Sequence, residues 1–299
     1  MGLTNFPNGI TSFGVPVMGG GGLIPLTLGK TFYVDSAGSA NTYSTLAGAY
    51  ASCVTSRGDV IIMKAGHAET VSAATGVVLS KIGVTVVGLG AGSMRPTITL
   101  SGTAATCTMN VTGANQTFKN FIVTNGIDEL VTAWTIAAAG CTLDGVDLLE
   151  TSASFQMIAG LTTTAAGTSM TIQNCTFRQV TASAGHGPAI SLVGADDCKI
   201  LNNFISWLGT NNAGSGGIVG ITTASLRVFI MGNYINAQGG ASVLGIGMYT
   251  GSTGVLAYNG ATTPNGAGSI VGASAMGTFQ NFAGTTGTTS GILDPAAGV

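Results

Sequence analysis

Met170-Thr-Ile-Gln-Asn-Cys175 is one copy of a short phrase that recurs between about residues 116 and 259. Other copies are Cys141-Thr-Leu-Asp-Gly-Val146 and Val228-Phe-Ile-Met-Gly-Asn-Tyr234. A fixed period in this range is the signature of a solenoid with one supersecondary unit per repeat. The marker residues of the copies, 25 to 30 residues apart, are Asn120, Gly145, Asn174, Asn203, Asn233 and Asn259.

The pattern inside each copy predicts strands. Apolar residues alternate, as at Met170 and Ile172, and a period of two is typical of a strand. The Asn or Gly that follows tolerates a left-handed backbone at a tight bend, and a second apolar stretch begins directly after it. A third strand, such as Ala189-Ile-Ser-Leu192, precedes each copy. We therefore predict an all-β, right-handed parallel β-helix with three strands and about 25–30 residues per coil.

Stacked coils place like residues over like. One expected internal column consists of Phe118, Leu143, Ile172, Ile200 and Ile230. We also expect the marker asparagines to form a structural ladder inside the turns, where their amides satisfy backbone groups of the bends. The members of this predicted ladder are Asn120, Asn174, Asn203 and Asn233.

Composition excludes several classes of function. Only 7% of the 299 residues are charged, and the net charge is -2, against about a quarter charged in ordinary soluble domains. Such a surface is unsuited to binding nucleic acid. The sequence has no run of about 18 uninterrupted apolar residues, so we predict no membrane-spanning segment. A surface so poor in charge suits a chain that partners cover, because few charges then need desolvating. A homotrimer is the oligomer we expect.

Four segments follow one another along the chain. Residues 1–30 form an extended Gly-rich arm, and residues 31–57 form a capping strand and helix. The β-helix occupies residues 58–283, and residues 284–299 form a C-terminal tail. A cap is needed because the first coil of a solenoid exposes an open apolar end. The apolar residues that make the arm a candidate docking segment are Phe6, Phe13, Val15, Val17, Leu23, Ile24 and Leu26.

No cofactor or metal is predicted. The five cysteines show no CxxC spacing and are interpreted as buried free thiols. His67 and His186 lie far apart in the repeat, which gives no support to a zinc site or a catalytic triad. The N-terminus shows no signal-peptide pattern, so we expect assembly in a cytoplasm.

Two groups of residues could suggest polysaccharide cleavage. Gly185-His186-Gly187 with Asp196 and Asp197 resembles pieces of the polygalacturonase signature, but the order is reversed and the Arg-x-Lys of that signature is missing. The simpler interpretation is a surface turn.

The second group is acidic, and carboxylates on neighbouring coils could hold Ca²⁺ as in pectate lyases. In the predicted register, however, Asp144 lies beside Lys119 and a surface ion pair explains it equally well. We therefore assign no catalytic residue. The acidic group comprises Asp128, Glu129, Asp144, Asp147 and Glu150.

The N-terminal region resembles the virion proteins of tailed bacteriophages. The resemblance rests on Asn8-Gly-Ile-Thr-Ser-Phe-Gly-Val-Pro-Val17, on Lys30-Thr-Phe-Tyr-Val-Asp-Ser36 and on Arg57-Gly-Asp-Val-Ile-Ile-Met-Lys-Ala-Gly-His-Ala-Glu-Thr70. It is clearest over residues 1–71, and beyond them only a pectin-lyase-like architecture is shared. The chain is thus similar to head decoration or minor capsid proteins.

The resemblance implies a non-enzymatic structural protein on the capsid exterior of a virion. Its partner would be the major capsid protein, to which the N-terminal arm would dock. The alternative is a tail spike or fibre that binds or cleaves host polysaccharide. That alternative calls for paired carboxylates in a groove and for exposed aromatic residues, whereas aromatic residues make up only 6% of the chain.

Overall fold

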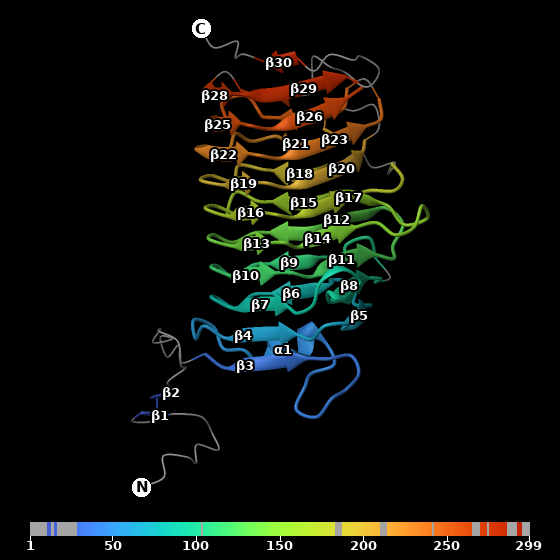
Figure 1. The fold of residues 1–299 in the computed structure, drawn as a ribbon, viewed down its shortest axis with the longest axis vertical. Helices are drawn as coiled ribbons and strands as arrows, with labels where there is room; N and C mark the ends of the chain where they lie inside the picture. Colours follow the sequence, from blue (N-terminus) through green and yellow to red (C-terminus); the bar gives the residue numbers. More distant parts are fainter. Residues whose placement is uncertain are drawn as a thin grey trace.

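The computed structural model describes residues 11–12, 15–16, 29–102, 104–182, 187–209, 214–240, 242–264, 270–273, 275–285 and 292–294. These residues form an all-β parallel solenoid of the right-handed type, with about eight coils. Three parallel sheets make up its walls, and successive coils stack along the long axis of the molecule (Figure 1). The predicted fold class is confirmed.

Each coil contributes one short strand to each sheet in turn. Sheet 1 contains β3 (Thr31–Val34), β4 (Val60–Met63), β7 (Thr85–Gly88), β10 (Thr117–Lys119), β13 (Thr142–Asp144), β16 (Thr171–Gln173), β19 (Lys199–Leu201), β22 (Val228–Met231), β25 (Thr253–Ala257) and β28 (Ala275–Phe279). Sheet 2 contains β5 (Ala68–Val71), β8 (Thr97–Leu100), β11 (Ile122–Asn125), β14 (Asp147–Leu149), β17 (Thr176–Arg178), β20 (Phe204–Leu208), β23 (Tyr234–Gln238), β26 (Gly260–Thr263), β29 (Asn281–Thr285) and β30 (Ile292–Asp294). Sheet 3 contains β6 (Val77–Leu79), β9 (Met109–Val111), β12 (Leu130–Ile136), β15 (Met157–Thr163), β18 (Pro188–Leu192), β21 (Gly216–Gly220), β24 (Leu244–Gly247) and β27 (Ile270–Val271).

The core is a set of columns that run through the coils. The strand register places Phe118, Leu143 and Ile172 side by side on β10, β13 and β16, and continues to Ile200 and Ile230. All five side chains are fully buried, so the predicted internal column is confirmed. Alternate residues of each strand point inward because successive side chains of a strand lie on opposite faces.

From β10 onward, sheets 1 and 2 meet at a tight corner of one left-handed residue per coil. Glycine and asparagine hold most of these positions because they tolerate positive φ best. Gly145, with φ of 65°, is one example. The register aligns the corner residues Asn120, Gly145, Asn174, Asn202, Gly232, Tyr258 and Gln280, all with positive φ.

The N-terminal end of the solenoid is closed by β3, α1 (Leu46–Ser52) and the chain around them. Thr45 caps α1 by accepting a hydrogen bond from the Gly48 amide at 3.1 Å. The helix packs against β3, β4 and β6, and covers the apolar end that a first coil exposes. Since β3 pairs with β4, sheet 1 begins at Thr31, within the segment predicted as a cap before the solenoid.

Three further elements complete the described chain. A 3₁₀ turn, η1 (Gly92–Met94), joins sheets 1 and 2. β1 (Thr11–Ser12) and β2 (Val15–Pro16) pair antiparallel, and Figure 1 shows them outside the solenoid on the side of β3. β30, from the predicted tail, pairs antiparallel with β29 and so belongs to sheet 2. No helix in the described ranges is long and apolar enough to cross a membrane.

Candidate functional site

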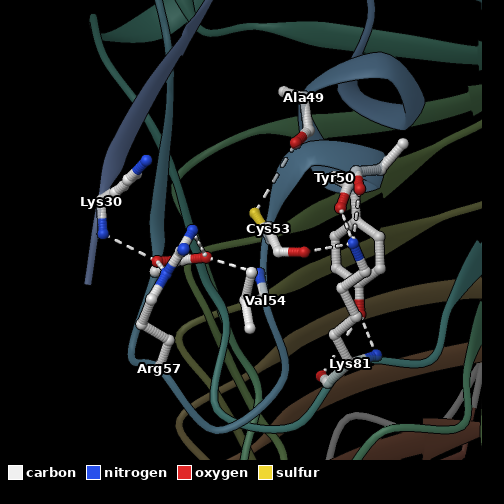
Figure 2. A network of polar contacts seen from close by, with 9 residues as sticks. Lys30, Ala49, Tyr50, Cys53, Val54, Arg57 and Lys81 are labelled. Carbon is white, nitrogen blue, oxygen red and sulfur yellow. Dashed lines mark hydrogen bonds and ion pairs between the residues drawn. The ribbon is translucent and has the colours of Figure 1, made fainter. Parts of the chain in front are cut away.

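A buried carboxylate fixes the point at which the N-terminal segment joins the solenoid. The Asp59 side chain is completely buried and accepts hydrogen bonds from the backbone amides of Lys30 and Val54, both at 2.7 Å. Arg57 holds the same carboxylate with its Nε at 2.6 Å and its Nη2 at 2.7 Å. Figure 2 shows Lys30, Val54 and Arg57 converging on this point. We call Asp59 and these three partners the exit clamp.

The exit clamp depends on an ionised carboxylate. Burial raises the pKa of Asp59, but the hydrogen bonds from Arg57, Val54 and Lys30 outweigh it and bring the pKa down to about 2. Bonds from charged or backbone donors to an ionised carboxylate favour its charged form. The clamp is therefore fully formed at neutral pH.

Lys81 fastens the capping helix to sheet 3. Its Nζ donates to the backbone oxygens of Tyr50 at 2.9 Å and Ala51 at 2.6 Å, and also to that of Cys53 (Figure 2). A cation suits this position because the last carbonyls of a helix lack partners within the helix. The Tyr50 hydroxyl accepts from the Lys81 amide at 2.6 Å and donates to Gln116 Oε1 at 3.2 Å. Burial raises the pKa of Tyr50 to about 12.

Three members of the acidic group predicted as a possible Ca²⁺ site, Asp144, Asp147 and Glu150, have polar partners within the protein. Lys119 Nζ lies 3.3 Å from Asp144, which confirms the predicted ion pair, and Asn174 also donates to Asp144. Asp147 pairs with Arg95, a contact that the repeat pattern does not predict.

Glu150 is the buried member of the acidic group and accepts from the amides of Met157, Val180 and Thr181. Burial raises the pKa of its carboxyl. No group of three or more metal-ligating side chains occurs among the described residues.

The group that resembles polygalacturonases is only partly described. Gly185 and His186 lie outside the described residues. Asp196 accepts from the Leu226 amide at 2.7 Å, and Asp197 pairs with Arg227 at 2.6 Å. Both aspartates thus serve as acceptors for the same short segment one coil later.

The asparagine ladder is real but has other members. Asn203 and Asn233 are buried, and Asn203 donates its Nδ2 to Asn233 Oδ1 at 2.9 Å. The same contact joins Asn233 to Asn259 at 2.9 Å and Asn259 to Asn281 at 3.0 Å. Each Nδ2 also donates to a backbone oxygen of the preceding coil, as Asn233 does to Ile200.

The prediction that Asn120 and Asn174 belong to this internal ladder is wrong. Both have positive φ and occupy the corner itself, one position before the inner column. The side-chain Nδ2 of Asn120 donates to the backbone oxygens of Gly88 and Gly90, and the Nδ2 of Asn174 donates to the Asp144 carboxylate. In their coils the inner position is held by Phe121 and Cys175. Asn120 and Asn174 lie one residue before the inner position, and a shift of one residue moves a side chain to the other face of the sheet.

The side chains of the predicted docking segment lie outside the described residues. Val15 belongs to β2, of which only the backbone is described. The other six positions are Phe6, Phe13, Val17, Leu23, Ile24 and Leu26.

A row of aromatic side chains on sheet 2 was not anticipated. Phe204, Tyr234 and Phe282 occupy one outward register position, with exposed fractions of 51%, 70% and 52%. Gly260 holds the same position between Tyr234 and Phe282, and a cleft of about 340 Å³ opens there. We call these four residues the aromatic row. The sequence signal was the residue after each ladder asparagine: Asn203-Phe204, Asn233-Tyr234, Asn259-Gly260 and Asn281-Phe282.

Comparison with known proteins identifies an architecture. No protein-family model and no curated protein matches the chain. Among solved structures, the pectin methylesterase of Aspergillus niger superposes with a TM-score of 0.52 at 16% identity, over 88% of this chain and 91% of that one. A rhamnogalacturonan lyase superposes with a TM-score of 0.44 at 13% identity, over 89% of this chain and 90% of that one. At this level of identity the likeness concerns the backbone alone: the chain has the pectin-lyase-like parallel β-helix fold.

Proposed function

We propose that the chain is a non-enzymatic structural protein of a bacteriophage particle. In this proposal residues 1–30 dock on the major capsid protein, and the β-helix is held over the outside of the shell. The bacteriophage origin rests on the resemblance of residues 1–71. The exit clamp is the structural observation that favours an anchoring role for the segment before it.

Three of the four exit-clamp residues, Lys30, Arg57 and Asp59, lie within the stretches that carry the resemblance. Lys30 and Asp59 come from two of those stretches, and the Lys30 amide donates to Asp59 while the Lys30 oxygen accepts from Val60. The arm is therefore fastened to β4 at the residue where it enters sheet 1. A force applied to a docked arm would pass into the sheet through these bonds, as an anchor requires.

The carboxylates of the described residues favour a structural role as well. Asp59 and Glu150 each accept hydrogen bonds from two or more backbone amides, and Asp147 and Asp196 accept from one each. Carboxylates used in this way hold coils together, whereas catalytic carboxylates must face a substrate.

The docking energy would come from the apolar residues of the arm. Burial contributes about 25 cal/mol per Å² of apolar surface, before the cost of association. Many copies on a symmetric shell would add avidity to a modest contact. The low charge of the chain supports this role, since few charges then need desolvating.

The test is binding to undecorated capsids of the bacteriophage concerned. The full chain would be compared with a version that lacks residues 1–28, which keeps Lys30 and the exit clamp. We expect saturable binding by the full chain and loss of binding by the truncated chain, with equal thermal unfolding of the two proteins. Equal binding by both would contradict docking by the arm. Binding by neither would contradict the capsid role altogether.

A further inference from the structure

The aromatic row projects from a rigid surface. Its side chains stand on β20, β23 and β29, whose inward neighbours are buried in the core; Ile205 and Ile235 are two of these neighbours. At least half of each of these side chains is exposed, so their burial contributes little to the stability of the fold. Their alignment on successive strands therefore calls for a role at the surface.

Gly260 interrupts the row and creates the cleft. Neighbouring strands lie about 4.8 Å apart, so Tyr234 and Phe282, two strands apart, stand about 9.6 Å from each other at the backbone. That gap accommodates the thickness of one ring between two others. The cleft of about 340 Å³ is lined by Tyr234, Gly260, Phe282 and their neighbours on β23, β26 and β29.

The fold itself does not require glycine at position 260. A Cβ added there would meet Tyr234 Cδ1 at 3.6 Å, an ordinary van der Waals contact, and the backbone does not have the positive φ that demands glycine. Gly254 differs, because a Cβ there would collide with the Val228 oxygen at 2.0 Å. The opening in the aromatic row is therefore not a by-product of backbone strain.

The polar groups beside the cleft are neutral. Asn236 and Thr262 lie among its lining residues, and Thr262 Oγ1 donates to Asn236 Oδ1 at 3.2 Å. Gln238 donates to the same oxygen at 2.5 Å. From Val228 to Leu293 the sequence contains no Asp, Glu, Lys, Arg or His. An amide and a hydroxyl can exchange hydrogen bonds with hydroxyl groups, and none of the residues that line the cleft carries a charge that would neutralise a charged ligand.

We propose that the aromatic row is a binding site for a neutral glycan. A pyranose ring has an apolar C–H face that packs on the negative face of an aromatic ring, and its rim of hydroxyl groups matches the amide and hydroxyl beside the cleft. One sugar ring would enter over Gly260 between Tyr234 and Phe282, and the next would lie toward Phe204. This site goes beyond the docking role and does not depend on it.

The test uses the full chain and a panel of neutral hexasaccharides: cellohexaose, maltohexaose and mannohexaose, with hexagalacturonate as the charged comparison. Saturation-transfer difference NMR measures contact between sugar protons and the protein. We expect signals from at least one neutral hexasaccharide, with a dissociation constant of about 1 mM or tighter, and none from hexagalacturonate.

Two variants address the site, and two matched variants control for bulk and for aromatic content. Gly260→Leu fills the cleft without removing an aromatic ring, and Phe282→Ala removes one wall. We expect each to weaken binding about tenfold or more. Gly277→Leu adds the same bulk on β28 of sheet 1, where the nearest atom to an added Cβ is 3.8 Å away. Phe229→Ala removes an exposed ring from sheet 1. Both controls should bind like the unchanged protein.

Three outcomes would overturn the proposal. The first is the absence of signal from every neutral hexasaccharide. The second is equal binding by Gly260→Leu and the unchanged protein. The third is a change of sedimentation coefficient in Gly260→Leu without any sugar binding, which would assign the aromatic row to contacts between copies of the chain. Far-UV circular dichroism and thermal unfolding of all four variants separate these outcomes from failure to fold.

Discussion

The coils before and after about residue 203 share one backbone plan but satisfy it with different chemistry. In the earlier coils the inner position after the corner is apolar, with Phe121, Val146 and Cys175. In the later coils asparagine holds that position at Asn203, Asn233, Asn259 and Asn281. A parallel solenoid thus closes the same corner either with apolar contact or with a column of buried amides.

The outer surfaces of the earlier and later coils also differ, in their content of charged and aromatic side chains. The earlier coils carry ion pairs, such as Lys119 with Asp144 and Arg95 with Asp147. After Arg227 the described chain up to Thr285 has no charged residue, and exposed aromatic side chains are concentrated there. Charges limit contact with apolar partners, whereas uncharged aromatic surface favours it. The two halves therefore differ in surface chemistry, and the proposed glycan site lies in the uncharged, aromatic half.

The largest loss of stability is expected from breaking the asparagine ladder, which is called the amide ladder below and consists of Asn203, Asn233, Asn259 and Asn281. Asn233→Leu keeps the side-chain size but removes the acceptor used by the Asn203 amide groups and the donor to the Ile200 oxygen. Leaving several buried polar groups unsatisfied costs about 1–3 kcal/mol each. We expect the free energy of unfolding in urea to fall by about 4 kcal/mol.

The matched control is Cys175→Val at the same position of an earlier coil, which is expected to cost less than about 1.5 kcal/mol. Equal losses from the two variants would show that the ladder adds nothing beyond packing.

The next-largest effect is a loss of stability at low pH. The folded pKa of Asp59 is about 2, below its ordinary value of 3.8, so the ionised clamp stabilises the fold above about pH 4 and this contribution disappears as the pH falls toward 2. The amide ladder contains no titratable group. As the pH falls from 4 to 2, protection from hydrogen exchange, corrected for the intrinsic pH dependence of amide exchange, should therefore be lost at residues 30–63 before it is lost at residues 228–263.

Asp59→Asn is the variant that tests this assignment. It keeps an acceptor for a backbone amide but loses the charge that Arg57 holds. We expect rapid exchange at residues 30–63 already at pH 7, with no further step between pH 4 and pH 2. A persistent acid step in this variant would assign the transition to another carboxylate.

A smaller effect is expected from extending the ladder. Cys175 lies next to Asn203, whose Oδ1 already accepts from the Cys175 amide at 2.9 Å. In Cys175→Asn the new side chain can donate to that oxygen. In Val146→Asn the new side chain has no amide neighbour in the column, because the adjacent positions hold Phe121 and Cys175. We expect Val146→Asn to lower the free energy of unfolding by about 2 kcal/mol and Cys175→Asn to cost less than half of that. The opposite order would contradict a cooperative ladder.

Alternation and period made the sheets and the internal columns predictable. Phe118, Leu143 and Ile172 could be aligned because each sits two residues before a bend. The same rule placed Lys119 beside Asp144. Contacts between adjacent coils follow from local pattern alone, because equivalent residues of parallel strands are neighbours.

The bends were less predictable. At Asn202-Asn203 either asparagine can be the corner residue, and the structure gives the corner to Asn202. A copy with a single asparagine, such as the one at Asn174, then aligns one residue away from Asn203. A shift of one residue exchanges inside for outside, which is why two of four predicted ladder members were misplaced.

The sequence within one repeat gives no indication of contacts that span more than one coil. Arg95 reaches Asp147, although the register separates their strands by β11. The cleft in the aromatic row exists because Gly260 has no side chain. It can be recognised only when the register places Tyr234 and Phe282 on either side of Gly260. Neither arrangement is encoded in the spacing within one repeat.

The smallest effect is expected from the exposed ion pair that ends the charged half. Arg227 and Asp197 bond at 2.6 Å, but their side chains are 59% and 43% exposed. Solvent screens such a pair, and double-mutant measurements of exposed pairs give about 0.2–1 kcal/mol. Arg227→Gln should therefore change the urea midpoint by less than Asp59→Asn does, and 0.5 M salt should abolish the difference. If Arg227→Gln destabilised as strongly as Asp59→Asn, the contrast between buried and exposed charge would fail. The division between the two halves would then rest on the amide ladder and the aromatic row alone.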